Sequence, residues 1–575
     1  MLQRWASCFS RGADGRRAQE EPEPEPFSFA DSLPPWPGGG GFALGRIRIG
    51  GGELEVAAAT AFQKICTLSS SREGGSATFY RPLGVPEGFS VLGHYCQPNC
   101  RPLHGHLLVA RAAAEGPSPP LSPPRDYVVV WAFRAGGVGN AGDGCGYGRC
   151  NAYFWRPVPP DGYRALGCLV TTDSRKPALE EVSCVRADLT DECEPHGSLL
   201  HLQLARQSSL CSAAFSVRGV RPVSRGMWGR GVGVGTFCCA ADGSSPREQG
   251  MACLSNVELD MSAMPTLEQA HALIRHYGPT VFFHPKEVYL PSSVAWFFKN
   301  GAALYSRGGG GVGEEVDGEG SNLPGGGCND GAYWIDLPCG ERRNAVCRGD
   351  IGSAELYAHV KPAMGGTCTD VAMWVFCPFN GPARLKLGPV TLPLGKTGQH
   401  VGDWEHFTLR ISNLTGELMA VYFSQHSGGR WVDASALEYN DGNRPVVYSS
   451  RNGHASYPYP GVYLQGSGAL GVGIRNDAAR SKIYVDSSSR YRIVAAEYLG
   501  DGAVDEPQWL QFMREWGPTV VYESRKRVER LIGRLPHQLR CGAENMLNKL
   551  PAELSKEEGP TGPKEKNNWE GDERW

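Results

Sequence analysis

The sequence predicts a mainly-β (α+β) protein: an N-terminal threefold β-repeat domain resembling a β-prism, followed by a β-sandwich domain with peripheral helices. A chain of 575 residues is longer than one hydrophobic core usually supports. Its 76 glycines and 42 prolines divide the chain into short segments, which favours strands and turns over long helices. We expect four regions, which are a disordered segment 1–26, the β-repeat domain 27–255, the β-sandwich domain 260–548 and an extended polar tail 549–575.

The first 26 residues are rich in Arg, Glu and Pro and end in EEPEPEP, so they have almost nothing apolar to bury and should be disordered. Cys8 in this segment could carry an S-acyl group, which is a hypothesis that the sequence alone does not test. The polar, Pro- and Gly-rich tail is expected to be extended for the same reason.

A repeated motif defines the first domain. FYRPLGVPEGFSVLG (79–93) recurs as FWRPVPPDGYRALG (154–167), and RPVSRGMWGRGVGVGTF (221–237) is a degenerate third copy. Each copy has a strand ending at Arg-Pro, a turn, and a second strand. This repetition predicts three similar β-units around a pseudo-threefold axis, as in a β-prism or a trefoil-like domain.

A helix signal opens the second domain. In PTLEQAHALIRHYGP, Thr266 is a suitable N-cap and Gly278-Pro279 a stop. Alternating segments such as HFTLRIS and ELMAVYFSQH then predict the strands of a β-sandwich. QWLQFMREW (508–516) is expected to be one of the peripheral helices.

Charge and hydropathy exclude two classes of partner. The net charge is −3 and the Lys and Arg residues are scattered, so we expect no nucleic acid. The first residues lack an apolar signal segment, and no run of about 18 apolar residues occurs. We therefore expect a cytoplasmic protein without a transmembrane segment, peripheral to endomembranes.

The 19 cysteines are expected to be mostly reduced, because an odd number without a secretion signal implies no disulfide framework. One cluster, CQPNCRPLHGH, offers zinc-ligand types at Cys96, Cys100, His104 and His106. Zinc patterns usually separate their ligand pairs by about a dozen residues or more, so two turn cysteines and two exposed hairpin histidines are the favoured interpretation.

The stretch HVGDWEH carries the candidate metal site. His400, Asp403 and Glu405 provide one imidazole and two carboxylates where a strand begins. In that strand Glu405 and Phe407 should face one side and His406 the other. Oxygen-rich donor sets suit Ca²⁺, Mg²⁺ or Mn²⁺, with water filling the remaining positions.

Three more polar residues, each at the end of a predicted strand, are candidate ligand-binding residues: His426, Asp433 and His454. A hydrolase could use Glu405 as its base and a histidine as its acid. However, the chain has no Gly-x-Ser-x-Gly, His-Glu-x-x-His or phosphate-loop motif. A non-catalytic role is therefore favoured, and a hydrogen-bonded cluster that fixes a turn is the structural alternative.

Several longer segments, among them PTLEQAHALIRHYGPTVFFHP, HVGDWEHFTLRISN, RNGHASYPYPGVYLQG and EEGPTGPKEKNNWEGDE, resemble the plant vacuolar protein sorting-associated protein 62 family. The resemblance extends from about residue 27 to the end. It implies a plant origin and a place in vacuolar sorting, and it specifies no reaction.

Residues 370–460 are also similar to the necrosis-inducing Nep-like proteins. That resemblance implies a β-sandwich that holds a divalent cation at the His-Asp-Trp-Glu motif. Proteins of that family bind plant sphingolipid headgroups. Asp403 and Glu405 match the acidic residues of the family motif, and His400 lies close to a motif histidine. Gly402 stands where the family has its second histidine.

Together these observations favour a soluble intracellular protein of vacuolar or endomembrane trafficking. It would bind membrane lipid headgroups or trafficking proteins, with a divalent cation at Asp403, Glu405 and His400. The alternatives are a metal-dependent hydrolase that uses Asp403 and Glu405, and a lectin-like, glycan-binding first half.

Overall fold

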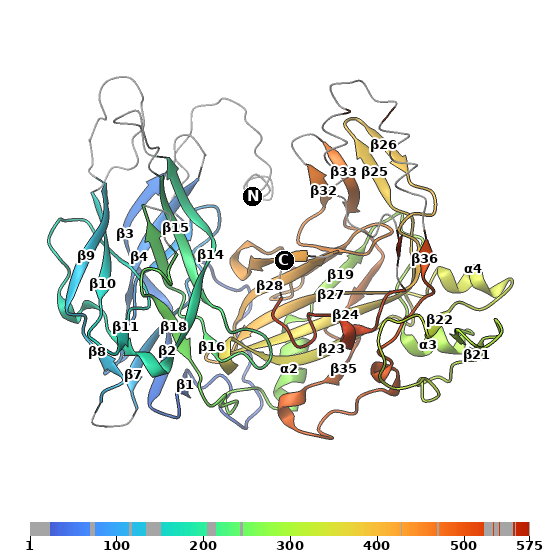
Figure 1. The fold of residues 1–575 in the computed structure, drawn as a ribbon, viewed down its shortest axis with the longest axis horizontal. Coiled ribbons are helices and arrows are strands. Elements are labelled where there is room, and N and C mark those ends of the chain that lie inside the picture. The colour runs from blue at the N-terminus through green and yellow to red at the C-terminus, as the bar shows by residue number, and fades with distance from the viewer. Residues whose placement is uncertain are drawn as a thin grey trace.

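The computed structural model shows a mainly-β protein with two lobes side by side (Figure 1), as the sequence predicts. Among the described residues, no helix combines the length and the apolar character needed to cross a membrane. Cys8 lies outside the described residues, which are 24–69, 75–113, 118–133, 151–203, 214–241, 245–426, 428–467, 471–521, 533, 540, 556–557 and 559–573.

Three antiparallel sheets form the inner part of the N-terminal lobe. The first sheet contains β3 (Ala61–Ser69), β4 (Ser76–Leu83) and β6 (Tyr95–Pro98), and the second contains β9 (Asp126–Phe133), β10 (Ala152–Val158) and β12 (Leu169–Thr171). The third sheet contains β14 (Thr190–Gln203), β15 (Ala214–Pro222) and β17 (Phe237–Ala240), and it is extended by β16 (Gly231–Val232) and β18 (Ala252–Ser255). The Arg-Pro of each repeat lies at or near the end of β4, β10 or β15. The copies in the sequence thus correspond to the three sheets.

Aromatic side chains from the three sheets meet in one core. The ring of Phe79 lies 5.0 Å from that of Phe154 and 5.4 Å from that of Phe237, and all three side chains are buried. Offset and edge-to-face aromatic pairs stabilise beyond the area that they bury. Each repeat therefore buries its aromatic side chain against the other two.

The turns of the repeats also meet, at Gly93, Gly167 and Thr236. Gly93 has φ of 158°, and a Cβ there would lie 2.9 Å from the Cα of Gly167. The backbone nitrogen of His94 donates to the oxygen of Cys168, and that of Cys168 to the oxygen of Phe237. Glycine is needed because the three chains approach too closely for a side chain.

Two outer sheets complete this lobe. The first contains β1 (Arg46–Ile49), β2 (Leu54–Ala59), β5 (Ser90–Val91) and β7 (Leu107–Ala112), and the second contains β8 (Leu121–Ser122), β11 (Tyr163–Arg164) and β13 (Cys184–Arg186). Their hydrophobic core includes Leu414 of the other lobe, so the two lobes share buried contacts.

A six-stranded sheet organises the C-terminal lobe in the order β29-β28-β27-β24-β23-β35. Its strands are β23 (Leu356–Ala363), β24 (Cys368–Asn380), β27 (His400–Ser412), β28 (Leu418–Gln425), β29 (Gly428–Asp433) and β35 (Tyr491–Ala495). Alternation along β27 places Phe407, Leu409 and Ile411 in one hydrophobic core and Trp404 in another.

Two four-stranded sheets lie beyond this one. They are β19 (Thr280–Phe283), β30 (Val446–Ser449), β31 (Ser456–Tyr457) and β34 (Tyr484–Asp486), and β25 (Arg384–Leu387), β26 (Val390–Pro393), β32 (Gly461–Ser467) and β33 (Val472–Ala478). Smaller pairings join β20 (Ala303–Ser306), β21 (Glu314–Glu315) and β22 (Tyr333–Asp336), and β36 (Val520–Val521) and β37 (Lys556–Glu557).

The α-helices in the described part of this lobe are short and peripheral. They are α2 (Leu267–Tyr277), α3 (Val294–Lys299) and α4 (Arg342–Cys347). α2 begins as predicted, because Thr266 and Gln269 form a reciprocal capping box. The predicted helix at 508–516 is instead one 3-10 turn, Gln508–Gln511, where burial of Trp509, Leu510, Phe512 and Trp516 in the core outweighs helical periodicity.

Both ends of the described chain pack against the C-terminal lobe, which changes the expected boundaries. Phe27, Phe29 and Trp36 contact the core of the sandwich, although the sequence assigns residues from 27 to the first domain. Residues 559–573 dock against the six-stranded sheet and are not an extended tail. Trp569 is buried and stacks on His359 with ring centroids 3.9 Å apart.

Polar contacts explain why composition misjudged this tail. Glu573 is buried, accepts from the hydroxyl of Thr408 at 2.6 Å and pairs with His406 at 3.1 Å. Burial acts to raise the pKa of Glu573, but its contacts with His406, Lys361 and Thr408 outweigh burial and hold this pKa down to about 2. The sheet supplies the partners that the tail's own sequence lacks.

We predict that Trp569→Ala lowers the free energy of unfolding by about 3–5 kcal/mol, because it leaves a cavity in the docked tail. Denaturant unfolding followed by tryptophan fluorescence and circular dichroism measures this change. Trp228→Ala is the control, since Trp228 is 50% exposed and its removal should cost less than about 0.5 kcal/mol. Equal effects of both variants would contradict tail docking.

Candidate functional site

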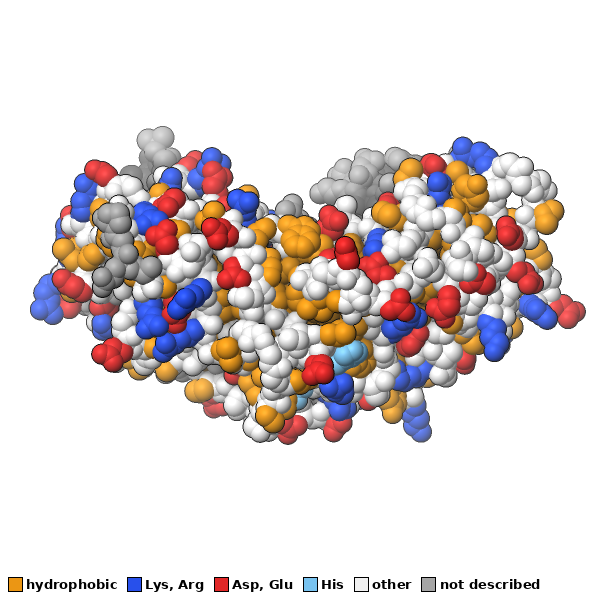
Figure 2. Space-filling view, turned by 90° about the horizontal axis from the view of Figure 1, so that it is seen from below, with side chains coloured by type: hydrophobic (Ala, Val, Ile, Leu, Met, Phe, Trp, Pro, Cys, Tyr) orange, Lys and Arg blue, Asp and Glu red, His pale blue; other side chains and the backbone are white. Residues whose placement is uncertain are grey.

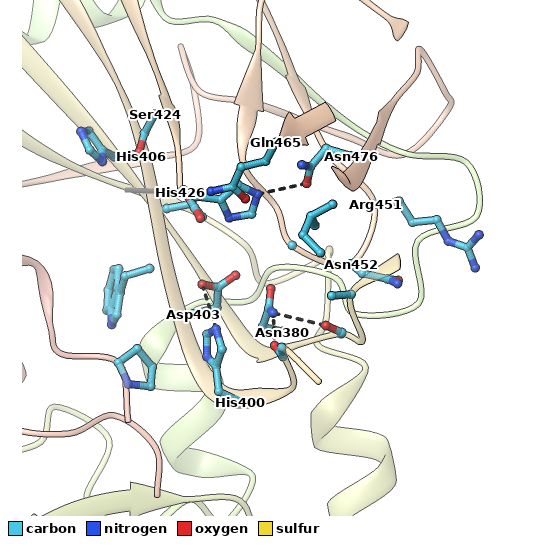
Figure 3. A pocket seen from close by; sticks show the side chains of 18 of the residues that line it. Asn380, His400, Asp403, His406, Ser424, His426, Arg451, Asn452, Gln465 and Asn476 are labelled. Carbon is cyan, nitrogen blue, oxygen red and sulfur yellow. Dashed lines mark hydrogen bonds and ion pairs between the residues drawn. The ribbon is translucent and has the colours of Figure 1, made fainter. Parts of the chain in front are cut away.

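A polar pocket of about 370 Å³ opens where β27 begins. The pairing of β27 with β28 starts only at Phe407 and Phe423, so His400, Asp403 and Glu405 precede the point where the two strands join. These three residues line the pocket, together with residues from β24, β28, β32 and β33. Figure 3 shows the labelled side chains arranged around a common space.

Asp403 is fixed by a buried ion pair with His454. The Nδ1 of His454 donates to the Oδ2 of Asp403 at 2.7 Å, and its Nε2 donates to the backbone oxygen of Tyr289 at 2.8 Å. An imidazole that donates from both nitrogens is protonated. Burial acts to lower the pKa of His454, but Cys377, Asp403 and Glu287 outweigh it and hold that pKa well above its ordinary value.

The same pair lowers the pKa of Asp403. Burial alone would raise it, whereas the hydrogen bond from His454 and the nearby His400 lower it. The Nε2 of His400 lies 3.9 Å from the Oδ1 of Asp403, and burial lowers the pKa of His400. The pocket therefore presents an ionised carboxylate beside a neutral imidazole.

The fit of these groups to a cation is partial. The donor set of two carboxylates and one imidazole suits a divalent ion, and the buried Nδ1 of His400 has no hydrogen-bond partner. However, the ligand atoms of His400, Asp403 and Glu405 do not all lie within 4.8 Å of one another. Among the described residues, only one group of three potential metal ligands is that close, and it lies outside this pocket. These residues fit a largely hydrated ion held by one or two carboxylates.

Amide side chains line the opposite wall of the pocket. The Nδ2 of Asn380 donates to the backbone oxygens of Gly381 and Gly398, and the Nε2 of His426 donates to the Oδ1 of Asn476 at 3.1 Å. The buried Nδ2 of Asn476 has no partner. Further lining residues with polar side chains include Arg384, Ser424, Asn452, Gln465, Arg475, Lys566 and Asn568.

Backbone strain gathers at this pocket. His426, Asn452 and His454 have φ of 57°, 72° and 50°, and they are three of the seven non-glycine residues with positive φ in the described chain. Such conformations cost of order 1–3 kcal/mol each and cluster at functional sites. His426 and Asn452 line the pocket, and His454 contacts the pocket residue Asp403 from behind.

Most of the residues predicted from the sequence meet here, with one exception. His400, Asp403, Glu405 and His426 line the pocket, and His454 lies behind Asp403. Asp433 lies elsewhere, in the cavity between the lobes. Sequence analysis missed the amides Asn380, Gln465 and Asn476, because nothing in their local pattern marks them as pocket residues.

Gly402 also has a structural explanation. Its φ is 66°, and a Cβ at this position would lie 2.3 Å from the backbone oxygen of Trp516. A histidine therefore has no room here, because the segment that packs Trp516 occupies the place of its side chain.

The fold and the site define a two-lobed β protein with a polar, partly charged pocket at one end of its central sheet. The chain belongs to the vacuolar protein sorting-associated protein 62 family, whose profile matches residues 23–573. This confirms the family that the sequence motifs predict.

A relative from Saccharomyces cerevisiae, vacuolar protein sorting-associated protein 62, is 26% identical over 172 residues. The match covers 27% of this chain and 35% of the yeast protein, so it spans about a third of that relative's length.

Solved structures with similar regions include GNIP1Aa from Chromobacterium piscinae, which is 18% identical with a TM-score of 0.27 and covers 38% of this chain and 40% of its own. Another is Necrosis and Ethylene inducing Protein 2 from the causal agent of cocoa's Witches Broom disease, at 20% identity and a TM-score of 0.16, covering 32% of this chain and 76% of its own. Scores this low carry no argument about function.

We predict that His454→Gln destabilises the protein by about 3–5 kcal/mol at neutral pH, because it leaves Asp403 buried without its charged partner. A histidine with a raised folded-state pKa stabilises fully below its unfolded pKa of 6.5 and progressively less as pH rises toward the folded value. The stability difference between wild type and variant should therefore shrink as pH increases above 6.5.

Urea unfolding of both proteins at several pH values between 5.5 and 9 tests this expectation. His271→Gln is the control, because His271 lies on α2 and contacts Tyr491, outside the pocket. A difference between wild type and His454→Gln that does not shrink as pH rises above 6.5 would show that folding does not raise the pKa of His454.

Proposed function

We propose that this protein is a non-catalytic binding module of vacuolar or endomembrane trafficking whose polar pocket takes the hydroxyl-rich headgroup of a membrane lipid. The observation that carries the proposal is the composition of the pocket wall, where amides, imidazoles, carboxylates and guanidinium groups face one space. The family membership supports the trafficking context. On this proposal the protein works in the cytoplasm, at endomembrane surfaces.

The chemistry of the wall matches a polyol. Amides both donate and accept hydrogen bonds, so Asn380, Gln465 and Asn476 can each satisfy a hydroxyl group. The unpartnered Nδ2 of Asn476 is a buried donor that a bound hydroxyl would satisfy.

Positive charge at the rim suits an anionic headgroup. Arg384, Arg475 and Lys566 line the pocket, and guanidinium groups bind phosphate in a bidentate geometry. Two of these charges are partly engaged, because Arg384 and Arg475 both pair with Asp477. A divalent cation held by Asp403 and Glu405, with water in its other positions, would bridge the carboxylates to the same headgroup.

The first test compares wild type with Asp403→Asn/Glu405→Gln on vesicles that carry phosphoinositide or glycosylated headgroups, with and without Ca²⁺, Mg²⁺ or Mn²⁺. We expect cation-dependent binding by wild type, competition by the soluble headgroup, and at least about tenfold weaker binding by the variant. Glu314→Gln/Glu315→Gln is the matched control, since both residues are exposed in β21 and neither lines the pocket.

Other outcomes of the same experiment overturn the proposal. Turnover of a phosphoester or glycoside panel with added cation, abolished by Glu405→Gln, would identify a metal-dependent hydrolase. Glycan binding that the pocket variant retains would favour a lectin-like activity outside the pocket, as the alternative of a glycan-binding first half requires. Absence of binding to every vesicle would remove the lipid headgroup as the ligand.

A second test separates function from packing at His426. We predict that His426→Gly lowers headgroup affinity by roughly tenfold or more while leaving stability unchanged or raised, because glycine adopts a φ of 57° without strain. Vesicle binding and denaturant unfolding of the same sample give both readouts. Lost stability with unchanged binding would show that His426 serves only to pack the turn.

A further inference from the structure

A second cluster of polar side chains lies between the lobes. Its first and last residues, His104 and Glu417, are more than 300 positions apart in the sequence. His104 and His106 come from the segment between β6 and β7 of the N-terminal lobe. Glu417 comes from the turn between β27 and β28 of the C-terminal lobe. One ligand atom of each lies within 4.8 Å of the other two, and this is the only such group of three in the described residues.

The two imidazoles have a geometry close to that of a chelate. The Nε2 of His106 lies 3.0 Å from the Nε2 of His104, with the rings at 76° to each other. Two nitrogens bound tetrahedrally to one Zn²⁺ at about 2.0–2.1 Å would be about 3.3 Å apart. A shift of a few tenths of an ångström would therefore admit an ion between them.

Asp433 fixes the orientation of His104. A carboxylate only accepts, so the contact of 3.3 Å between the Nδ1 of His104 and Asp433 makes Nδ1 the donor and leaves Nε2 with its lone pair. Asp433 itself accepts from Ser435 at 2.7 Å and pairs with Arg101 at 3.0 Å. A carboxylate behind a metal-binding histidine is the common outer partner of zinc sites.

The surroundings separate this cluster from Cys96, whereas Cys100 lines the same cavity as the two histidines. Cys96 is buried in the aromatic core of the N-terminal lobe, so it is not part of the cluster. The rings of Phe27 and Phe29 lie 4.9 and 6.0 Å from that of His104 and shield one side. His104 and His106 also line a cavity of about 1040 Å³ between the lobes, which has room for a water molecule as a further ligand. Figure 2 shows hydrophobic side chains gathered between the two lobes.

We propose that His104, His106 and Glu417 bind a divalent transition-metal ion, with Zn²⁺ as the preferred ion, and that this ion joins the two lobes. Two imidazoles and one carboxylate form the donor set of many zinc sites that keep a fourth position for water. Imidazole ligands favour Zn²⁺ over Ca²⁺ or Mg²⁺, which prefer oxygen. Because the ligands come from both lobes, binding requires the lobes to be docked.

The experiment uses the full chain, purified, treated with chelator and then titrated with Zn²⁺ alone. Elemental analysis after dialysis gives the stoichiometry, and Co²⁺ substitution gives a visible d–d spectrum that reports nitrogen ligands. The variants are His104→Ala/His106→Ala and the more conservative Glu417→Gln, which replaces one carboxylate oxygen with an amide nitrogen. The controls are His271→Ala and, for the polar pocket, Asp403→Asn/Glu405→Gln.

We expect one Zn²⁺ per wild-type chain and a higher melting temperature in its presence, because an ion that binds only the folded state stabilises it. The double histidine variant should bind at least about 100-fold more weakly, since even the loss of an outer-shell partner costs about 10–100-fold. Glu417→Gln should weaken binding and both controls should retain it, so this result does not depend on the proposed headgroup site.

Two results would overturn the proposal. One is the absence of stoichiometric Zn²⁺ binding by the folded wild type. The other is binding by Glu417→Gln and by the double histidine variant that equals that of wild type, which would show that the two imidazoles share only a hydrogen bond.

Discussion

The pairing of β24 with β27 is the constraint on which most of this structure depends. Its register extends from Cys368 opposite Ser412 to Asn380 opposite His400. Because side chains alternate along a strand, this one register sends Phe407 and its neighbours into one core and Trp404 into the other. A slip by one residue would exchange the two faces and would turn Asp403 away from His454.

The same strand connects the two sites. β27 begins in the polar pocket and ends at the turn that carries Glu417, and at about 3.3 Å per residue these ends are roughly 40 Å apart. The pocket is built within one lobe, whereas the cluster of histidines exists only when the lobes are docked. A headgroup and a metal ion would therefore bind at different parts of the molecule. The headgroup would bind in the polar pocket, and the metal ion would bind at the interface between the lobes.

Buried ion pairs recur in the described part of the C-terminal lobe. His454 pairs with Asp403, Glu573 with His406, and Arg410 forms two hydrogen bonds with Asp370. An unpaired charge in such surroundings would cost several kcal/mol, so these pairs specify how the tail and the turns dock. The C-terminal segment is thus part of the folded domain, because its acidic residues complete pairs that the sheet leaves open.

The sequence by itself determined the features that depend on neighbouring residues. The repeated Arg-Pro strands, the N-cap of α2 at Thr266 and the alternation from Glu405 onward are local patterns, and each occurs as expected. Composition also predicted a mainly-β fold, because Gly and Pro limit element length. The motif around Asp403 could be recognised in the sequence because four of its polar residues lie within the short stretch HVGDWEH.

Only the tertiary structure decided which distant residues meet. The tail seemed extended by composition but docks, and QWLQFMREW forms a 3-10 turn because burial of its aromatic residues outweighs helical periodicity. Asp433 lies outside the pocket and contacts His104, a residue 329 positions away in the sequence. Cys96 is buried in the core of the N-terminal lobe, apart from His104 and His106. Such contacts depend on strand register and on how the lobes pack, and neither is encoded in a local pattern of residues.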